Sequence, residues 1–202
     1  MTTGGRTIAG FLGVFLLLAG AVPVAAGEAE AAPSPELVAR VFERFRGLAG
    51  SWRGSSTKGW TGSSEFRPLA RGTVVLSLSE FDDAPPERAM ASAVHVDGGR
   101  LVLTHYCEAG NQPRLVAAAI TPDAREVEFR FLDGTGMASR DEGHMDRAVF
   151  RFHGPDRFDS RWTWYQDGRE TWLEEITYVR EETAAAAPAT APAADRPAGD
   201  HH

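Results

Sequence analysis

The sequence has little cysteine and little lysine, and each shortage excludes a class of protein. Cys107 is the only cysteine, so the chain can form neither an internal disulfide nor an all-cysteine metal site. Lys58 is the only lysine, the arginines are scattered, and the formal net charge is −7. Nucleic-acid backbones and anionic membrane surfaces bind clustered basic residues, so neither is an expected partner.

The rest of the composition is that of a folded protein. The chain has 202 residues, of which 43% are hydrophobic. This is enough for one domain with a sizeable core and for short appendages at its ends.

The first 26 residues have the pattern of a secretory signal peptide. Arg6 precedes an apolar run over residues 8–24, and Ala25 and Ala26 end a small-residue cleavage site. Pro23 and several glycines interrupt the run, which favours cleavage over a retained transmembrane helix. We therefore expect export to the periplasm or the extracellular space, with no membrane insertion after cleavage.

The exported chain divides into three parts by composition. Residues 27–33 are a short Ala/Glu spacer, residues 34–180 contain the regular hydrophobic patterns, and residues 181–202 are rich in alanine and proline. The composition of the last segment predicts disorder. One domain over 34–180 is therefore expected.

That domain opens with a predicted amphipathic helix. Ser34 is a good N-cap, Pro35 suits the first helical position, and apolar residues recur at helical spacing from Leu37 to Leu48. The helix should end within 47–50, where two glycines lie. Its apolar stripe needs a partner surface, which the mouth of a barrel would supply.

From Ser51 onward the pattern changes to short alternating runs separated by Gly, Pro, Asp and Asn. The connections are short and contain no helical crossovers, which is typical of an up-and-down meander. So long a meander removes its free edges by closing into an antiparallel β-barrel of about ten strands. The strands are expected near 51–59, 63–69, 73–81, 88–96, 100–107, 114–120, 126–132, 144–152, 157–166 and 171–180.

Two sets of residues carry a family resemblance. Trp52 lies between Gly50 and Gly54 where the helix meets the first strand, which resembles the opening of lipocalin-like and nitrobindin-like barrels, whose tryptophan plugs one end. Segments 103–107, 110–114 and 143–145 resemble a group of secreted bacterial proteins of this class.

The resemblance implies a barrel with an internal cavity and implies no enzyme reaction. In nitrobindin-like barrels a histidine late in the chain holds a haem iron. The two last predicted strands here contain no histidine, which argues against haem and leaves any cofactor unknown.

Unusual chemistry is concentrated in residues 103–114. Because side chains alternate along a strand, His105 and Cys107 should share one face and Tyr106 the other. The loop that follows brings Asn111, Gln112 and Arg114 close together, and these offer donors for a carboxylate, phosphate or carbonyl. The same loop also has ordinary turn chemistry.

Two further features complete the candidate site. The long irregular connection over residues 133–144 is expected to form a mobile flap beside His105, and the tryptophans and phenylalanines either fill the barrel or line a pocket. The ligand-binding residues expected from the sequence are His105, Tyr106, Asn111, Gln112, Arg114, His144 and Trp164.

Three functions are compatible with these patterns. The leading hypothesis is an exported, non-enzymatic barrel that binds a small, partly apolar ligand. The first alternative is a metal- or cysteine-dependent hydrolase or isomerase that uses His105, Cys107 and His144. The second is a structural envelope protein with a filled barrel. The sequence leaves the ligand and the oligomeric state open.

Overall fold

The structure is a computed structural model, which describes residue 1 and residues 32–182, without the side chains of Trp172 and Leu173. The expected signal peptide beyond its first residue, the spacer up to residue 31 and the tail from residue 183 lie outside the described residues. Within the described part, no helix combines the length and the hydropathy needed to cross a membrane.

The predicted helix is confirmed. Helix α1 spans Pro35–Gly47, and the Ser34 hydroxyl accepts a hydrogen bond of 3.3 Å from the backbone N–H of Leu37. An acidic residue lies in its first turn and basic residues in its last, which suits the helix dipole. Its buried face consists of Val38, Val41 and Phe45.

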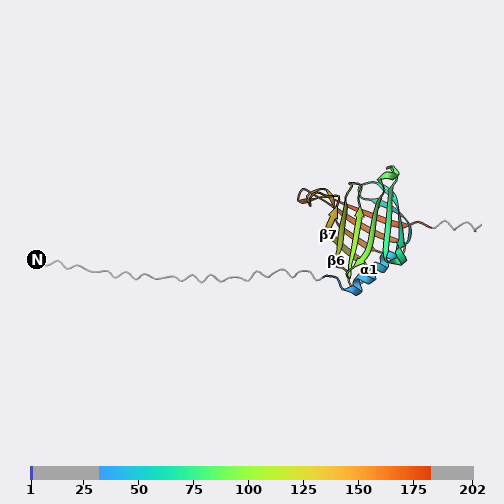
Figure 1. The fold of residues 1–202 in the computed structure, drawn as a ribbon, viewed down its shortest axis with the longest axis horizontal. Helices are drawn as coiled ribbons and strands as arrows, with labels where there is room; N and C mark the ends of the chain where they lie inside the picture. The colour runs from blue at the N-terminus through green and yellow to red at the C-terminus, as the bar shows by residue number, and fades with distance from the viewer. Residues whose placement is uncertain (2–31, 183–202) are drawn as a thin grey trace, which may run out of the picture.

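The closed ten-stranded barrel is also confirmed (Figure 1). Each strand pairs antiparallel with the next along the chain, and β1 pairs with β10 to close the sheet. No edge is left for another chain to extend. The strands are β1 (Gly50–Ser56), β2 (Thr61–Leu69), β3 (Val74–Phe81), β4 (Met90–Asp97), β5 (Arg100–Tyr106), β6 (Gln112–Ile120), β7 (Glu126–Thr135), β8 (His144–Phe152), β9 (Arg157–Gln166) and β10 (Arg169–Arg180).

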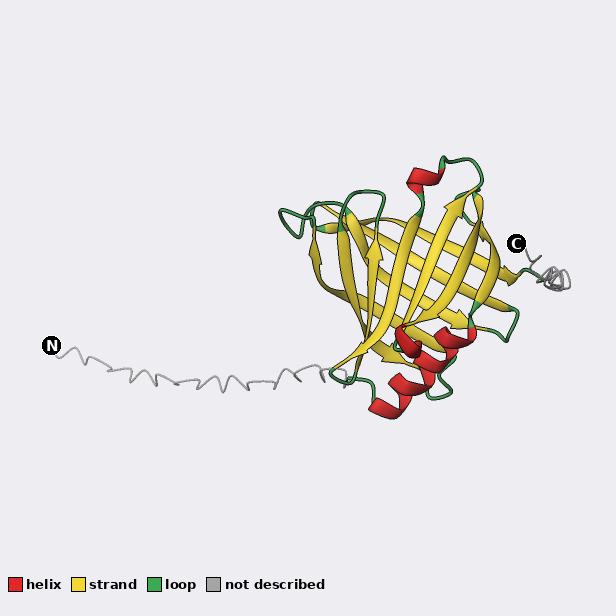
Figure 2. Ribbon diagram, turned by 45° about the vertical axis from the view of Figure 1, so that its right-hand side comes forward, coloured by secondary structure: helices red, strands yellow, loops and turns green. Residues whose placement is uncertain are grey.

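Helix α1 closes one end of the barrel, and the loop with the short helix η2 (Pro86–Arg88) lies at the other (Figure 2). The ring of Phe45 lies 5.1 Å from that of Phe150 inside the barrel. Arg40 and Arg44 donate hydrogen bonds of 2.9 and 3.1 Å to the carbonyls of residues 122 and 123. The helix was expected to cover an end of the barrel, and it does so with the ring of Phe45 inside the lumen.

The junction between helix and barrel depends on Trp52 and Arg180. The buried Trp52 donates from Nε1 to the Leu48 carbonyl at 2.7 Å. Arg180 lies 4.2 Å over the Trp52 ring and donates to the carbonyls of Gly47 and Ala49 at 3.0 and 2.8 Å. These bonds satisfy carbonyls that a helix end leaves without an internal partner, so the last strand fixes the helix in place.

Candidate functional site

The inner face of the barrel changes character along its axis. Near α1 it is filled by large apolar side chains, and toward the other end the inner positions of several strands hold serine. The apolar set includes Trp52, Phe66, Phe129, Phe150 and Phe158. The small polar set comprises Ser64, Ser77, Ser79, Ser92 and Ser160, of which all but Ser64 line a pocket. Small side chains on a wall of fixed radius leave space, so the half away from the helix is hollow.

That half contains a cavity of about 770 Å³, open at the end opposite α1. A smaller pocket of about 60 Å³ lies in the lumen and shares five of its lining residues. The shared residues are Trp60, Phe81, Met90, Met145 and Glu174. A volume of this size and a largely apolar wall are typical of sites for small organic molecules.

Glu174 places a carboxylate in this wall. Its side chain faces inward from β10 and the residue is only 7% exposed. Oε2 accepts hydrogen bonds from the Trp60 indole at 2.6 Å and from the Ser56 hydroxyl at 2.8 Å. Both donors are neutral, so the bonds orient the carboxylate without cancelling its charge.

His105 is the second polar group in the wall. Nδ1 lies 3.0 Å from the Ser92 hydroxyl, whereas Nε2 is buried and has no hydrogen-bond partner among the described residues. The residue is 5% exposed. Burial lowers the pKa of His105 to about 4, so the imidazole is neutral near pH 7.

Two other titratable side chains of the wall are also neutral. Burial raises the pKa of Tyr178 to about 12 and raises the pKa of the Cys107 thiol above its ordinary value. Cys107 lies at the mouth of the cavity, just beyond the end of β5. A protonated thiol is a weak nucleophile and a weak metal ligand, so Cys107 contributes packing surface.

The structure places some of the sequence-predicted residues in the cavity and others outside it. Trp164 lines the cavity, and His105 lines the smaller pocket in the lumen. Tyr106 is exposed on the outer face, because its neighbour His105 points inward. Arg114 also points outward and forms a two-pronged ion pair with Asp133, one bond of which measures 2.5 Å. The Arg114 guanidinium, which was expected to contact a ligand, therefore lies on the outer face of the barrel.

The loop that carries Asn111 and Gln112 is held by its own hydrogen bonds. Asn111 is buried and donates to the carbonyl of Gly143 at 2.8 Å. Gln112 donates to the carbonyl of Gly110 at 3.2 Å and accepts from the Thr135 hydroxyl at 2.8 Å. Neither side chain lines the cavity; together they join this loop to the connection between β7 and β8.

His144 lies beneath that connection, on the outer face of the barrel and fully buried. Nδ1 is 2.6 Å from the Glu142 carbonyl, and Nε2 contacts the Arg140 guanidinium. A carbonyl only accepts and a guanidinium only donates, so His144 is neutral, with its proton on Nδ1. Both nitrogens are occupied, and neither is available to a metal or a substrate.

Arg140 pins the connection to the barrel. Its guanidinium lies 4.2 Å from the centre of the Phe131 ring and 3.9 Å from that of Tyr165, and it also contacts Asp146. The segment expected as a mobile flap is thus held by an arginine between two aromatic rings. Part of it, up to Thr135, belongs to β7.

The three residues that the enzyme alternative requires do not lie together in the structure. His105 and Cys107 lie on the cavity wall, whereas His144 lies outside it. In the part of the chain that the structure describes, no three His, Cys, Asp or Glu side chains are grouped in a way that would hold a metal ion. The filled-barrel alternative also disagrees with the structure, because a pocket of about 60 Å³ remains in the lumen and a larger open cavity lies at its end.

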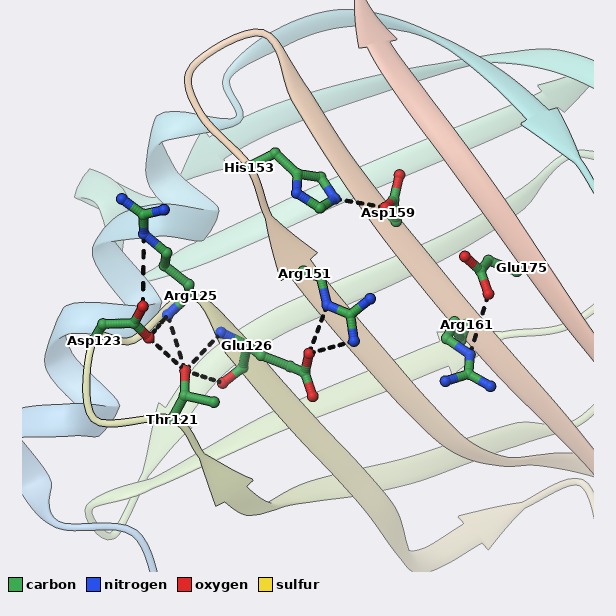
Figure 3. Close-up of polar contacts among 9 residues, drawn as sticks. All are labelled: Thr121, Asp123, Arg125, Glu126, Arg151, His153, Asp159, Arg161 and Glu175. Atoms are coloured by element: carbon green, nitrogen blue, oxygen red, sulfur yellow. Dashed lines mark hydrogen bonds and ion pairs between the residues drawn. The ribbon is translucent and has the colours of Figure 1, made fainter.

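A second group of polar residues lies on the outer face near α1 (Figure 3). Its members pair with one another: Arg151 with Glu126 at 2.7 Å, His153 with Asp159 at 2.5 Å, and Arg161 with Glu175 at 3.3 Å. These pairs connect neighbouring strands, and none of these residues lines the cavity or the pocket in the lumen. We interpret them as ladders that stabilise the outer surface.

No protein-family model and no curated protein matches the chain, so the lipocalin-like resemblance rests on its motifs. Among solved structures, the chain is similar to a DUF3598-family protein of unknown function from Nostoc punctiforme, with a TM-score of 0.45 and 12% identity over 68% of this chain and 49% of that one. The chain therefore spans about half the length of that protein. It is also similar to EF1p2_mFAP2b bound to DFHBI, with a TM-score of 0.31 and 11% identity over 70% of this chain and 99% of that one. Likenesses this distant carry no information about function.

Proposed function

We propose that the protein is an exported, non-enzymatic carrier or sensor that binds a small, partly apolar molecule inside its barrel. The observation that carries this proposal is the cavity of about 770 Å³ at the end opposite α1. Its wall combines aromatic and methionine side chains with the buried carboxylate of Glu174, and the buried His105 lines the adjoining pocket in the lumen. Export is supported by the signal-peptide pattern of residues 1–26.

The chemistry of the wall supports binding over catalysis. The Cys107 thiol has a raised pKa, and the neutral His105 contacts a serine hydroxyl without a carboxylate behind it that would make it a stronger base. The cavity thus offers an apolar surface and a few orienting polar atoms, which is what a binding site needs.

Native mass spectrometry of protein purified from its own host, compared with a cavity-blocking variant, tests the proposal. Met90 lines both pockets, so Met90→Trp should fill the lumen. Leu78, 42% exposed on the outer face of β3, gives the matched control Leu78→Trp. We expect a co-purifying small molecule on the wild type and the control and none on Met90→Trp. A mass that persists on Met90→Trp, or an empty wild type that binds no compound in a ligand screen, would contradict the proposal.

A further inference from the structure

The pocket within the lumen is lined by one acidic side chain, whereas the lining of the larger cavity at the mouth also includes Lys58, Asp83, Arg88 and Glu108. Three titratable side chains face the pocket within the lumen: Glu174, His105 and Tyr178. The histidine and the tyrosine are both neutral near pH 7, because burial lowers the pKa of His105 to about 4 and raises the pKa of Tyr178 to about 12. The lumen is therefore negative, with the charge on the Glu174 carboxylate.

None of the described residues forms an ion pair with this carboxylate. Its hydrogen-bond partners among them are the Trp60 indole and the Ser56 hydroxyl. Both bonds go to Oε2, so Oε1 retains its capacity to accept. A buried charge without a counter-ion costs folding free energy, which a purely structural residue would avoid.

The surroundings of Glu174 suit a positive charge. The Trp60 and Phe81 rings meet edge to face beside it, with their centres 4.9 Å apart. Aromatic faces attract ammonium groups, and this attraction strengthens when the site is shielded from water. At the mouth, Arg88 is paired with Glu108 at 2.5 Å, so the arginine is not a free counter-charge for an anion.

An independent polar group lies in the same lumen. The Nε2 atom of His105 is buried and unpartnered among the described residues, and the residue lines the inner pocket together with Glu174. Buried polar atoms in folded proteins are almost always hydrogen-bonded. A bound molecule with a polar group at its inner end would supply the partner.

We propose that the cavity binds an amphipathic organic cation, a protonated amine whose N–H donors bind Oε1 of Glu174 beside Trp60 and whose apolar body lies in the open cavity at the barrel end. The inference deepens the proposed function and rests on it. A protonated amine satisfies the carboxylate by charge and by hydrogen bonding at once. An anion of the same shape would be repelled by Glu174.

Three probes of one shape and different charge test this inference by isothermal titration calorimetry at neutral pH: naphthylmethylamine, naphthylmethanol and naphthoic acid. We expect the amine to bind the wild type roughly tenfold or more tightly than the alcohol, and the acid to bind weakest. In Glu174→Gln, which keeps the shape and removes the charge, the amine and the alcohol should bind about equally. Asp133→Asn removes one carboxylate from the outer face, and it should keep the wild-type preference.

The outcomes separate this inference from the proposed function. Equal binding of amine and alcohol to the wild type, or an amine preference that survives Glu174→Gln, overturns the inference and leaves a binding barrel in place. Probes that all fail to bind the wild type, or that bind Met90→Trp equally well, overturn both.

The melting temperature without ligand distinguishes a binding role of Glu174 from a structural one. Glu174→Gln should melt at or above the wild-type temperature, because it removes an uncompensated buried charge. A clear drop in the melting temperature would mean that the Glu174 carboxylate stabilises the fold. If Glu174→Gln does not fold, the order in which the wild type binds the three probes still tests whether the cavity prefers a cation.

Discussion

His105 is the residue whose protonation should couple most strongly to folding. Burial lowers its pKa from 6.5 to about 4, so below the ordinary value the unfolded chain binds the proton more readily than the folded barrel. Stability is therefore complete above about pH 6.5 and falls as the pH decreases toward 4. We expect a loss of about 2–3 kcal/mol in unfolding free energy between about pH 7 and pH 4.5.

Urea unfolding of wild type and His105→Leu at the two pH values measures this coupling. The variant lacks the titrating ring but keeps the apolar volume, so its stability should change less with pH than that of the wild type. Asp82 and Asp133 also have lowered pKa values, through their hydrogen bonds to arginines, but both are present in both proteins and cancel in the comparison. Parallel pH profiles would show that His105 is not buried as described.

For single residues, the sequence predicted the types of side chain that line the cavity better than the positions that supply them. Strand alternation placed His105 and Tyr106 on opposite faces of one strand, and the structure has His105 facing inward and Tyr106 outward. The same alternation put Glu174 on one face with Ile176 and Tyr178, and an acid among inward residues was the signal that could have revealed the carboxylate. Only the pairing of strands, however, shows which face of a strand is inside.

Single elements show where local patterns suffice and where they do not. All ten predicted strands are present, and most of their ends agree within two residues, because alternation and turn residues are local signals. His144 is different. A bulge between Met145 and Arg147 shifts the register of β8, so that Met145 points into the lumen while His144 lies outside beside Tyr165. A bulge of this kind depends on the partner strand, and the sequence does not reveal it.

The junction between α1 and β10 gives a prediction about element packing. Arg180 holds the carbonyls of Gly47 and Ala49 and stacks on Trp52. Arg180→Met keeps an aliphatic chain and removes these bonds, so it should lower the unfolding free energy by about 2 kcal/mol.

Chemical denaturation provides the measurement, and Arg67→Met is its matched control. Among the described residues, Arg67 pairs with Glu65 of its own strand, and its side chain is 62% exposed. Loss of such a surface pair should cost less than about 1 kcal/mol. If both substitutions had the same small effect, the helix would be held by its apolar face alone.

The whole barrel has two halves with different packing. At the helix end Phe45, Trp52 and Phe158 are completely buried and in ring contact with other aromatic side chains, whereas the other end has an open cavity of about 770 Å³. Side chains around a cavity make fewer packing contacts than side chains in a filled core. Local opening should therefore cost less free energy at the cavity end, although both halves belong to one closed sheet.

Hydrogen exchange followed by mass spectrometry should resolve this difference along each strand. Amides near the helix end, such as those of residues 51–52, 101–103 and 127–129, should exchange most slowly. Amides of 61–63, 79–81 and 104–106, at the other end of paired strands, should exchange faster. A ligand in the lumen should slow exchange at the second set and leave the first almost unchanged, because only the hollow half gains contacts. Uniform protection along the strands, or a ligand effect centred on α1, would place the binding site elsewhere in the barrel.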